Sequence, residues 1–135
     1  MLMPKYKSLI ENLFENGKFN KEAYDRLVRA DNRVIKYLTH ELLVNSNPDI
    51  REVCAEILHE RGHARAVPSL IEALEDKELS VRQDALWAIG SLCGFERFES
   101  FLRITNVDPP WKLYRRVSEW WRLNKRYIEK NWEIW

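Results

Sequence analysis

The sequence is poor in the residues that build turn-rich, cross-linked or membrane-spanning proteins. Its 135 residues include only four glycines and five prolines, which disfavours a β architecture with many turns. Two cysteines, Cys54 and Cys93, are too few for a disulfide framework, so we expect a reducing, cytoplasmic location. No apolar stretch is long enough to cross a membrane, and the first residues lack the apolar run of a signal peptide. The formal net charge of +1 gives no reason to expect a nucleic-acid or membrane partner.

The sequence is instead rich in apolar residues at helical spacing. Hydrophobic residues make up 45% of the chain and recur every three or four positions in successive windows. The first expected helix stops at Gly17. A later one begins at Asn47 and Pro48, which suit a helix cap and a first helical position, and it ends at Gly62. No segment is typical of a strand, so we predict a single all-α domain over residues 1–135.

The middle of the chain repeats itself. Residues 47–76 and 77–105 align at an offset of 31 residues, with Ile50-Arg51 on Val81-Arg82. Self-similarity at this period is typical of stacked helical hairpins, none of which can bury its apolar face alone. The run I-R-x-x-C-A-x-I-L-x-x-x-G-x-A-R-A-V-P-S-L-I-E-A-L-E-D resembles the HEAT-like repeat of the phycobilisome-lyase type.

This resemblance implies a short α-solenoid of about three helical hairpins. Residues 47–76 form the best-matching repeat and 77–105 a second one, with further helices in 1–46. The resemblance also implies a hydrogen-bonded ladder between repeats, because Asp76 and Arg82 are six residues apart and Asn45 and Arg51 repeat that spacing.

Residues 59–63 read H-E-R-G-H, which on one continuous helix is the zinc-binding pattern of metal hydrolases. If Gly62 ends the helix, however, His63 lies beyond it and the two imidazoles no longer share a face. No histidine follows His63 to supply a third ligand. The His40-Glu41 and His59-Glu60 pairs invite comparison with deoxyhypusine hydroxylases, which are HEAT-repeat enzymes, but in those the pairs occupy other repeat positions. We therefore expect no catalytic residue, no metal and no cofactor.

The last segment, residues 111–135, is aromatic and basic. It holds five of the six tryptophans and seven Lys/Arg against three Glu. The simplest interpretation is an amphipathic cap over the open end of the solenoid. Twenty-five helical residues would span ~37 Å, however, against ~20 Å for a repeat helix of ~13 residues. The segment therefore either breaks near Asn124 into a hairpin or carries a binding surface beyond the cap.

We expect the function to be non-catalytic protein binding, as an adaptor, inhibitor, immunity-type protein or regulatory subunit. The resemblance implies a concave face lined by the second helix of each repeat, and helical phase places Lys36, His40, Ser69, Glu72, Glu99 and Arg103 there. Tryptophan and arginine are enriched at binding hot spots. The candidate partner-binding residues are Trp120, Trp121, Trp132, Trp135, Arg115, Lys36, His40, Glu72 and Arg103.

Several alternatives stay open. The family resemblance leaves room for a bilin lyase or pigment-complex factor, or for a metal-dependent HEAT-repeat hydroxylase. DNA glycosylases of similar fold need a cationic concave face, and this one mixes signs, so nucleic acid is not expected. A homodimer through the C-terminal helix is a further hypothesis, and no membrane partner is expected.

Overall fold

A computed structural model describes residues 4–93 and 110–130 of the chain. Its elements, with 3-10 helices labelled η, are α1 Pro4–Glu11, β1 Phe14–Glu15, β2 Lys18–Phe19, α2 Lys21–Arg29, α3 Val34–Val44, α4 Pro48–Arg61, η1 Ala64–Ala66, α5 Val67–Glu72, η2 Ala73–Glu75, α6 Leu79–Cys93 and α8 Pro110–Lys130. Residues Arg103, Trp132 and Trp135, and the second half of the predicted repeat 77–105, lie outside the described residues.

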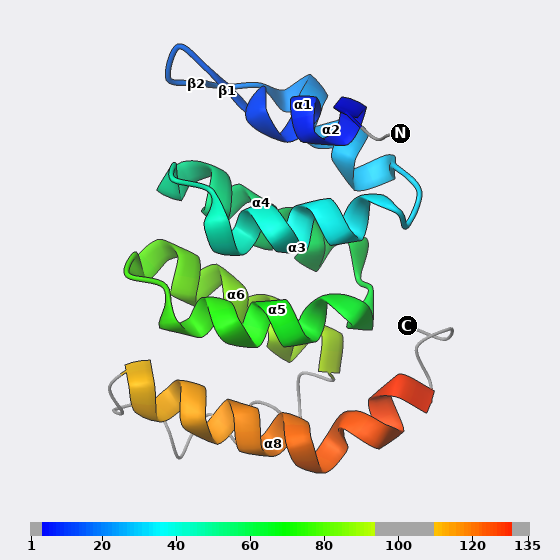
Figure 1. The fold of residues 1–135 in the computed structure, drawn as a ribbon, viewed down its shortest axis with the longest axis vertical. Helices are drawn as coiled ribbons and strands as arrows, with labels where there is room; N and C mark the ends of the chain where they lie inside the picture. Colours follow the sequence, from blue (N-terminus) through cyan, green and yellow to red (C-terminus); the bar gives the residue numbers. More distant parts are fainter. Residues whose placement is uncertain (1–3, 94–109, 131–135) are drawn as a thin grey trace.

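The helices stack in layers that form two columns, with α1 beside α2, α3 beside α4 and α5 beside α6 (Figure 1). One column holds α2, α4 and α6, and the other holds α1, α3, α5 and α8. Apolar stripes from both columns meet between them, so the fully buried side chains include Leu38, Ile57, Leu70 and Ile89. The predicted short all-α solenoid is confirmed.

The boundaries of α4 follow from its sequence as predicted. The Asn47 side chain caps the helix by accepting a hydrogen bond from the Asp49 backbone N–H, and Pro48 opens the first turn. Gly62 ends the helix in a left-handed conformation with φ of 67°, which a residue with a side chain rarely adopts.

The expected end of the first helix is wrong. That helix, α1, stops at Glu11, and Gly17 belongs instead to a small antiparallel hairpin in which Phe14 pairs with Phe19. Asn16 and Gly17 both have positive φ, which is the requirement of the tight turn that suits the twist of paired strands. The prediction that no segment forms a strand is therefore wrong for residues 14–19, and the Asn-Gly pair was the sequence signal for it.

A ladder of hydrogen bonds joins the layers, as the resemblance implied. The Arg51 Nη1 donates to the Asn45 carbonyl at 2.7 Å, and 31 residues later the Arg82 Nη1 donates to the Asp76 carbonyl at 2.7 Å. Arg51 also donates from Nε and Nη2 to both Asp76 carboxylate oxygens, at 2.8 and 3.1 Å. Only 6% of the Arg51 side chain and 10% of the Asp76 side chain are exposed. This buried ion pair therefore links α4 to the loop that precedes α6.

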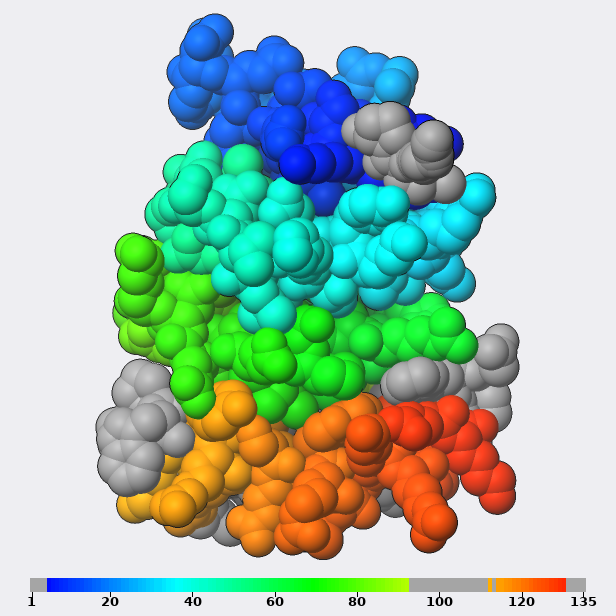
Figure 2. All heavy atoms as spheres, in the orientation of Figure 1, coloured from blue at the N-terminus to red at the C-terminus, as the bar shows by residue number. Residues whose placement is uncertain are grey.

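The final helix, α8, is continuous from Pro110 to Lys130, so the break considered near Asn124 does not occur. The Asn124 side-chain amide donates to the Trp120 carbonyl at 2.8 Å, one turn back along the helix. Helix α8 packs against α5, η1 and η2, and it buries Val117, Trp121 and Ile128. It thereby extends the α1–α3–α5 column by one layer, which Figure 2 shows along one face of the molecule.

The buried ion pair yields a direct test of the ladder. Replacing Arg51 with Ala leaves the Asp76 carboxylate buried without its guanidinium, and it should lower the free energy of unfolding by about 3–5 kcal/mol. Urea denaturation measures the change. The matched control is Arg33→Ala, because Arg33 pairs equally closely with Asp31 but 65% of its side chain is exposed. The control should cost less than about 1 kcal/mol. Equal losses in the two variants would contradict the structural role of the ladder.

Candidate partner-binding surface

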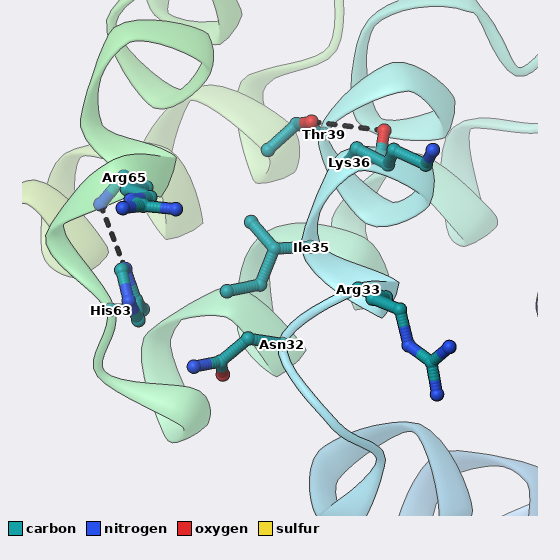
Figure 3. A pocket seen from close by; sticks show the side chains of 7 residues that line it. All are labelled: Asn32, Arg33, Ile35, Lys36, Thr39, His63 and Arg65. Atoms are coloured by element: carbon teal, nitrogen blue, oxygen red, sulfur yellow. Dashed lines mark hydrogen bonds between the residues drawn. The ribbon is translucent and has the colours of Figure 1, made fainter.

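A pocket of about 460 Å³ opens between the start of α3 and the connection from α4 to α5 (Figure 3). Two loops at the same end of the column therefore shape it, one before α3 and one after α4. Its lining residues are Asn32, Arg33, Ile35, Lys36, Thr39, His63 and Arg65.

Arg61, the last residue of α4, fixes the loop that forms one wall of this pocket. Arg61 donates from Nη1 to the carbonyls of Leu27 and Val28 at 2.9 and 2.8 Å, which satisfies backbone acceptors in the last turn of α2. Its Nη2 donates to Asn32 Oδ1 at 3.1 Å. Arg61 therefore fixes the position of the loop between α2 and α3, together with the orientation of the Asn32 amide.

The opposite wall follows from the turn at Gly62. Once Gly62 has ended α4, His63 caps η1 by accepting a hydrogen bond at Nδ1 from the Arg65 backbone N–H, at 3.1 Å. Arg65 is exposed, and its guanidinium points across the pocket toward Ile35 (Figure 3).

The lining residues include three cationic side chains and no carboxylate. Arg33 is paired with Asp31 through bonds of 3.0 and 2.8 Å, and this guanidinium holds the pKa of Asp31 well below its usual range. The Lys36 Nζ lies 5.3 Å from the centre of the Tyr37 ring. Figure 3 shows Arg33 and Lys36 extending to the side of α3 away from Arg65, so Arg65 is the cation that faces the pocket from the far wall.

The structure brings one of the predicted residues into this pocket. Lys36 lines it, whereas His40 is exposed one turn further along α3 and Glu72 is exposed on α5. Asn32, His63 and Arg65 were not among the candidates because they lie in helix connections, where helical phase assigns no face. In a solenoid, the short loops line up at the ends of the helices. The sequence could therefore have shown that the loops before α3 and after α4 lie close together.

The predicted residues of the last helix divide between surface and core. Arg115 is exposed and Trp120 is half-buried against the core, but Trp121 is buried, with 9% of its surface exposed. Among the side chains of α8 that the structure describes, Leu123 and Tyr127 are the large hydrophobic ones that are exposed, at 70% and 61%. We therefore leave Trp121 out of the proposed contact surface.

The two histidines of the H-E-R-G-H segment make separate contacts. His59 Nε2 lies 3.0 Å from the Ser91 hydroxyl, and the ring meets Trp87 edge-on, whereas His63 turns toward Arg65. Within residues 4–93 and 110–130 no group of three or more His, Cys, Asp or Glu side chains is placed to hold a metal ion. Burial raises the pKa of the Cys54 thiol, so this residue is a packed thiol rather than a nucleophile.

The other column carries an acidic surface. Glu52, Glu56 and Glu60 follow one another at single-turn spacing along α4, and Asp84 on α6 lies near Glu52 and Glu56. Burial, followed by the charges of Glu52 and Glu56, raises the pKa of Asp84 from its ordinary 3.8 to about 6. This acidic surface therefore lies in the other column from α3, which lines the pocket.

Comparison with known proteins identifies the repeat. The family model described as HEAT repeats matches residues 35–120. The match is to HEAT repeats as a class and does not support the phycobilisome-lyase type. No curated protein matches the chain. In the part of the chain that the structure describes, every helix is too short or too polar to span a membrane.

The raised pKa of Asp84 predicts a pH-dependent stability. Folded protein holds the Asp84 proton up to about pH 6, whereas the unfolded chain releases it near pH 3.8, so this group lowers stability as the pH rises between these values. Asp84→Asn carries no charge and should raise the free energy of unfolding at pH 7, with an advantage that disappears toward pH 4.

Urea denaturation of both proteins across this range measures the difference. Glu11→Gln, on the exposed surface of α1, is the control and should give a difference that does not change with pH. An Asp84→Asn advantage that stays constant from pH 4 to pH 7 would show that the carboxylate is not perturbed.

Proposed function

Because the chain belongs to the HEAT-repeat family, we propose that it is a non-catalytic protein-binding module, working as an adaptor, inhibitor or regulatory subunit. HEAT repeats commonly mediate protein–protein interaction. The observation that carries the proposal for this chain is the cationic pocket at the loop end of the α3–α5 column. The proposed location is the cytoplasm, supported by a free, buried Cys54.

The α3–α5 column supports binding through its exposed polar side chains. Lys36 and His40 follow one another along α3, and Glu72 lies on α5, which packs against α3. A partner that covers this column would meet the pocket at one end and mixed charges along its length. Such a surface suits a specific polar contact, because charges at an interface select the partner and its orientation.

Helix α8 offers a second contact surface. Arg115, Leu123 and Tyr127 are exposed along it, and arginine and tyrosine are residue types enriched at binding hot spots. We propose that this surface extends the partner contact or joins two copies of the chain. Bilin attachment and metal-dependent hydroxylation are weaker alternatives, because no described group of residues favours either.

Site-specific photo-cross-linking in the native host tests the proposal. A benzophenone amino acid replaces Lys36 in one variant and Glu72 in another, and a third carries it at Gln83, which is exposed on α6 in the other column. We expect Lys36 and Glu72 to form covalent adducts with the same protein, identified by mass spectrometry, and Gln83 to form none with it. Absence of adducts at both Lys36 and Glu72, or equal adducts at Gln83, would overturn the proposal.

A further inference from the structure

Helix α8 carries a row of cations on its exposed side. Arg122, Arg126 and Lys130 are all exposed and follow one another four residues apart, or about 6 Å along the helix axis. We call these three residues the basic row. Leu123 and Tyr127 have the same spacing and are 70% and 61% exposed, so apolar surface runs beside the charges.

The helix as a whole is strongly basic. Its 21 residues include seven lysines and arginines and two glutamates. One of these glutamates, Glu129, pairs at 3.6 Å with Lys125, which lies outside the basic row. Two α8 helices from different copies of the chain would repel each other, because like charges would face each other across the contact. A surface rich in carboxylates suits this helix better.

The same chain has such a surface on α4. Glu52, Glu56 and Glu60 follow one another four residues apart, which is the spacing of the basic row on α8. We call these three residues the acidic row. Glu56 and Glu60 are exposed and Glu52 is half-buried, so their carboxylates face outward from the α2–α4–α6 column.

The arginines of α4 and α6 are committed to other contacts. Arg51 and Arg82 donate to the ladder between the layers, and Arg61 donates to the end of α2 and to the loop after it. Neither helix contains a lysine. Arg29 of α2 lines a pocket together with Glu60, at one end of the acidic row. The cations of α4 and α6 therefore serve the fold, and the acidic row keeps its charge for an external partner.

An aromatic side chain lies beside the acidic row. Trp87 on α6 is 57% exposed, and its ring meets His59 of α4 edge-on, with the ring centres 6.4 Å apart. His59 follows Glu56 by three residues and Trp87 follows Asp84 by three, so the side chains of each pair are neighbours on one side of their helix. Carboxylates beside an exposed indole suit guanidinium groups and large apolar side chains.

We infer that α8 of one copy of the chain binds the α4–α6 face of a second copy, with the basic row along the acidic row and Leu123 beside Trp87. Within one copy, α8 packs against α5, η1 and η2, in the other column from α4 (Figure 1). Its exposed basic row can therefore meet an acidic row only in a second copy. Since the two contacting surfaces differ, the copies join as a reciprocal pair or as a larger head-to-tail oligomer.

The inference rests on the second contact surface of the proposed function and gives that surface one occupant, a second copy. Analytical ultracentrifugation of the full chain over a range of concentrations tests it. We expect dimers or larger species at low salt. Association should weaken by about tenfold or more at 1 M NaCl, where the screening length falls to about 3 Å from about 10 Å at 0.1 M.

Two charge-reversed variants test the pairing of the rows. One combines Arg122→Glu with Arg126→Glu, and the other combines Glu56→Arg with Glu60→Arg. Each variant alone should associate at least about tenfold more weakly than the parent, because its two rows now share a sign. An equal mixture of the two should associate again, because each row then meets its opposite charge. Mixing cannot restore a protein that has simply failed to fold.

The matched control combines Lys5→Glu with Lys7→Glu. Both lysines are exposed on α1, at the other end of the stack from α8 (Figure 1). This variant changes the net charge by as much as the α8 variant does, and it should associate as the parent does. Four results would each overturn the inference: a monomer at every concentration at low salt, association that survives the α8 reversal, an equal loss in the α1 control, or a mixture that stays monomeric.

A benzophenone amino acid at Leu123 in the native host identifies the occupant. We expect an adduct with α4 or α6 of a second copy, and an adduct with a different protein alone would overturn the inference. An adduct at Gln83 with a second copy also supports it, and mass spectrometry distinguishes that species from an adduct with the partner protein.

The inference and the proposed function fail separately. If the chain stays monomeric while Lys36 and Glu72 cross-link to a partner, the contact between copies falls and the protein-binding function stands. If the chain associates as expected but Lys36 and Glu72 give no adduct, the contact between copies stands and binding through the α3–α5 column falls.

Discussion

The ion pair between Arg51 and Asp76 is the interaction on which the stacked arrangement depends. A buried guanidinium and a buried carboxylate are tolerated only when each satisfies the other, and here two hydrogen bonds between them are joined by a third from Arg51 to the Asn45 carbonyl. These bonds fix the distance and register between α4 and the loop that starts α6. Apolar packing alone would permit sliding, since buried methyl and methylene groups make contacts without direction.

The same arginine chemistry positions the proposed binding site. Arg61 joins the end of α4 to the end of α2 and to Asn32, so the two loops that line the pocket are held by one side chain. Gly62 then turns the chain so that His63 and Arg65 form the facing wall. The H-E-R-G-H segment, which on a longer helix would suggest zinc, instead supplies an inter-layer clamp, a helix end and part of a pocket.

Much of the fold was predictable because local rules and the repeat agree. Asn47, Pro48 and Gly62 each mark a boundary of α4 through their own backbone preferences, and the 31-residue offset correctly places Arg51 and Arg82 in equivalent bonds. Asn45 stands at the position that Asp76 occupies 31 residues later. The residue 31 positions before Arg51 is Asn20, so no preceding arginine requires a carboxylate there.

The pocket and the orientation of α8 could not be predicted from local residue preferences or from the repeat. Asn32, His63 and Arg65 come together only because Arg61 and the Gly62 turn bring two loops to one place, which is a consequence of tertiary packing. In α8, a helical pattern identifies an apolar face but not what covers it. Trp121 is therefore buried, whereas Tyr127, six residues further along the helix, is exposed. The Asn16-Gly17 hairpin is different, since its dipeptide signal was present in the sequence and was outweighed by the apolar spacing of the first helix.

Native-state hydrogen exchange measures most directly whether Arg51 and Asp76 join the layers into one cooperative unit. Amides in the middle of α4, such as Ile57, and in the middle of α6, such as Ile89, belong to different hairpins but pack against each other in the same column. If the ion pair couples the hairpins, the slowest amides of both helices should exchange through one opening with the free energy of global unfolding. Exchange of the α6 amides through a separate opening of clearly lower free energy would contradict this account.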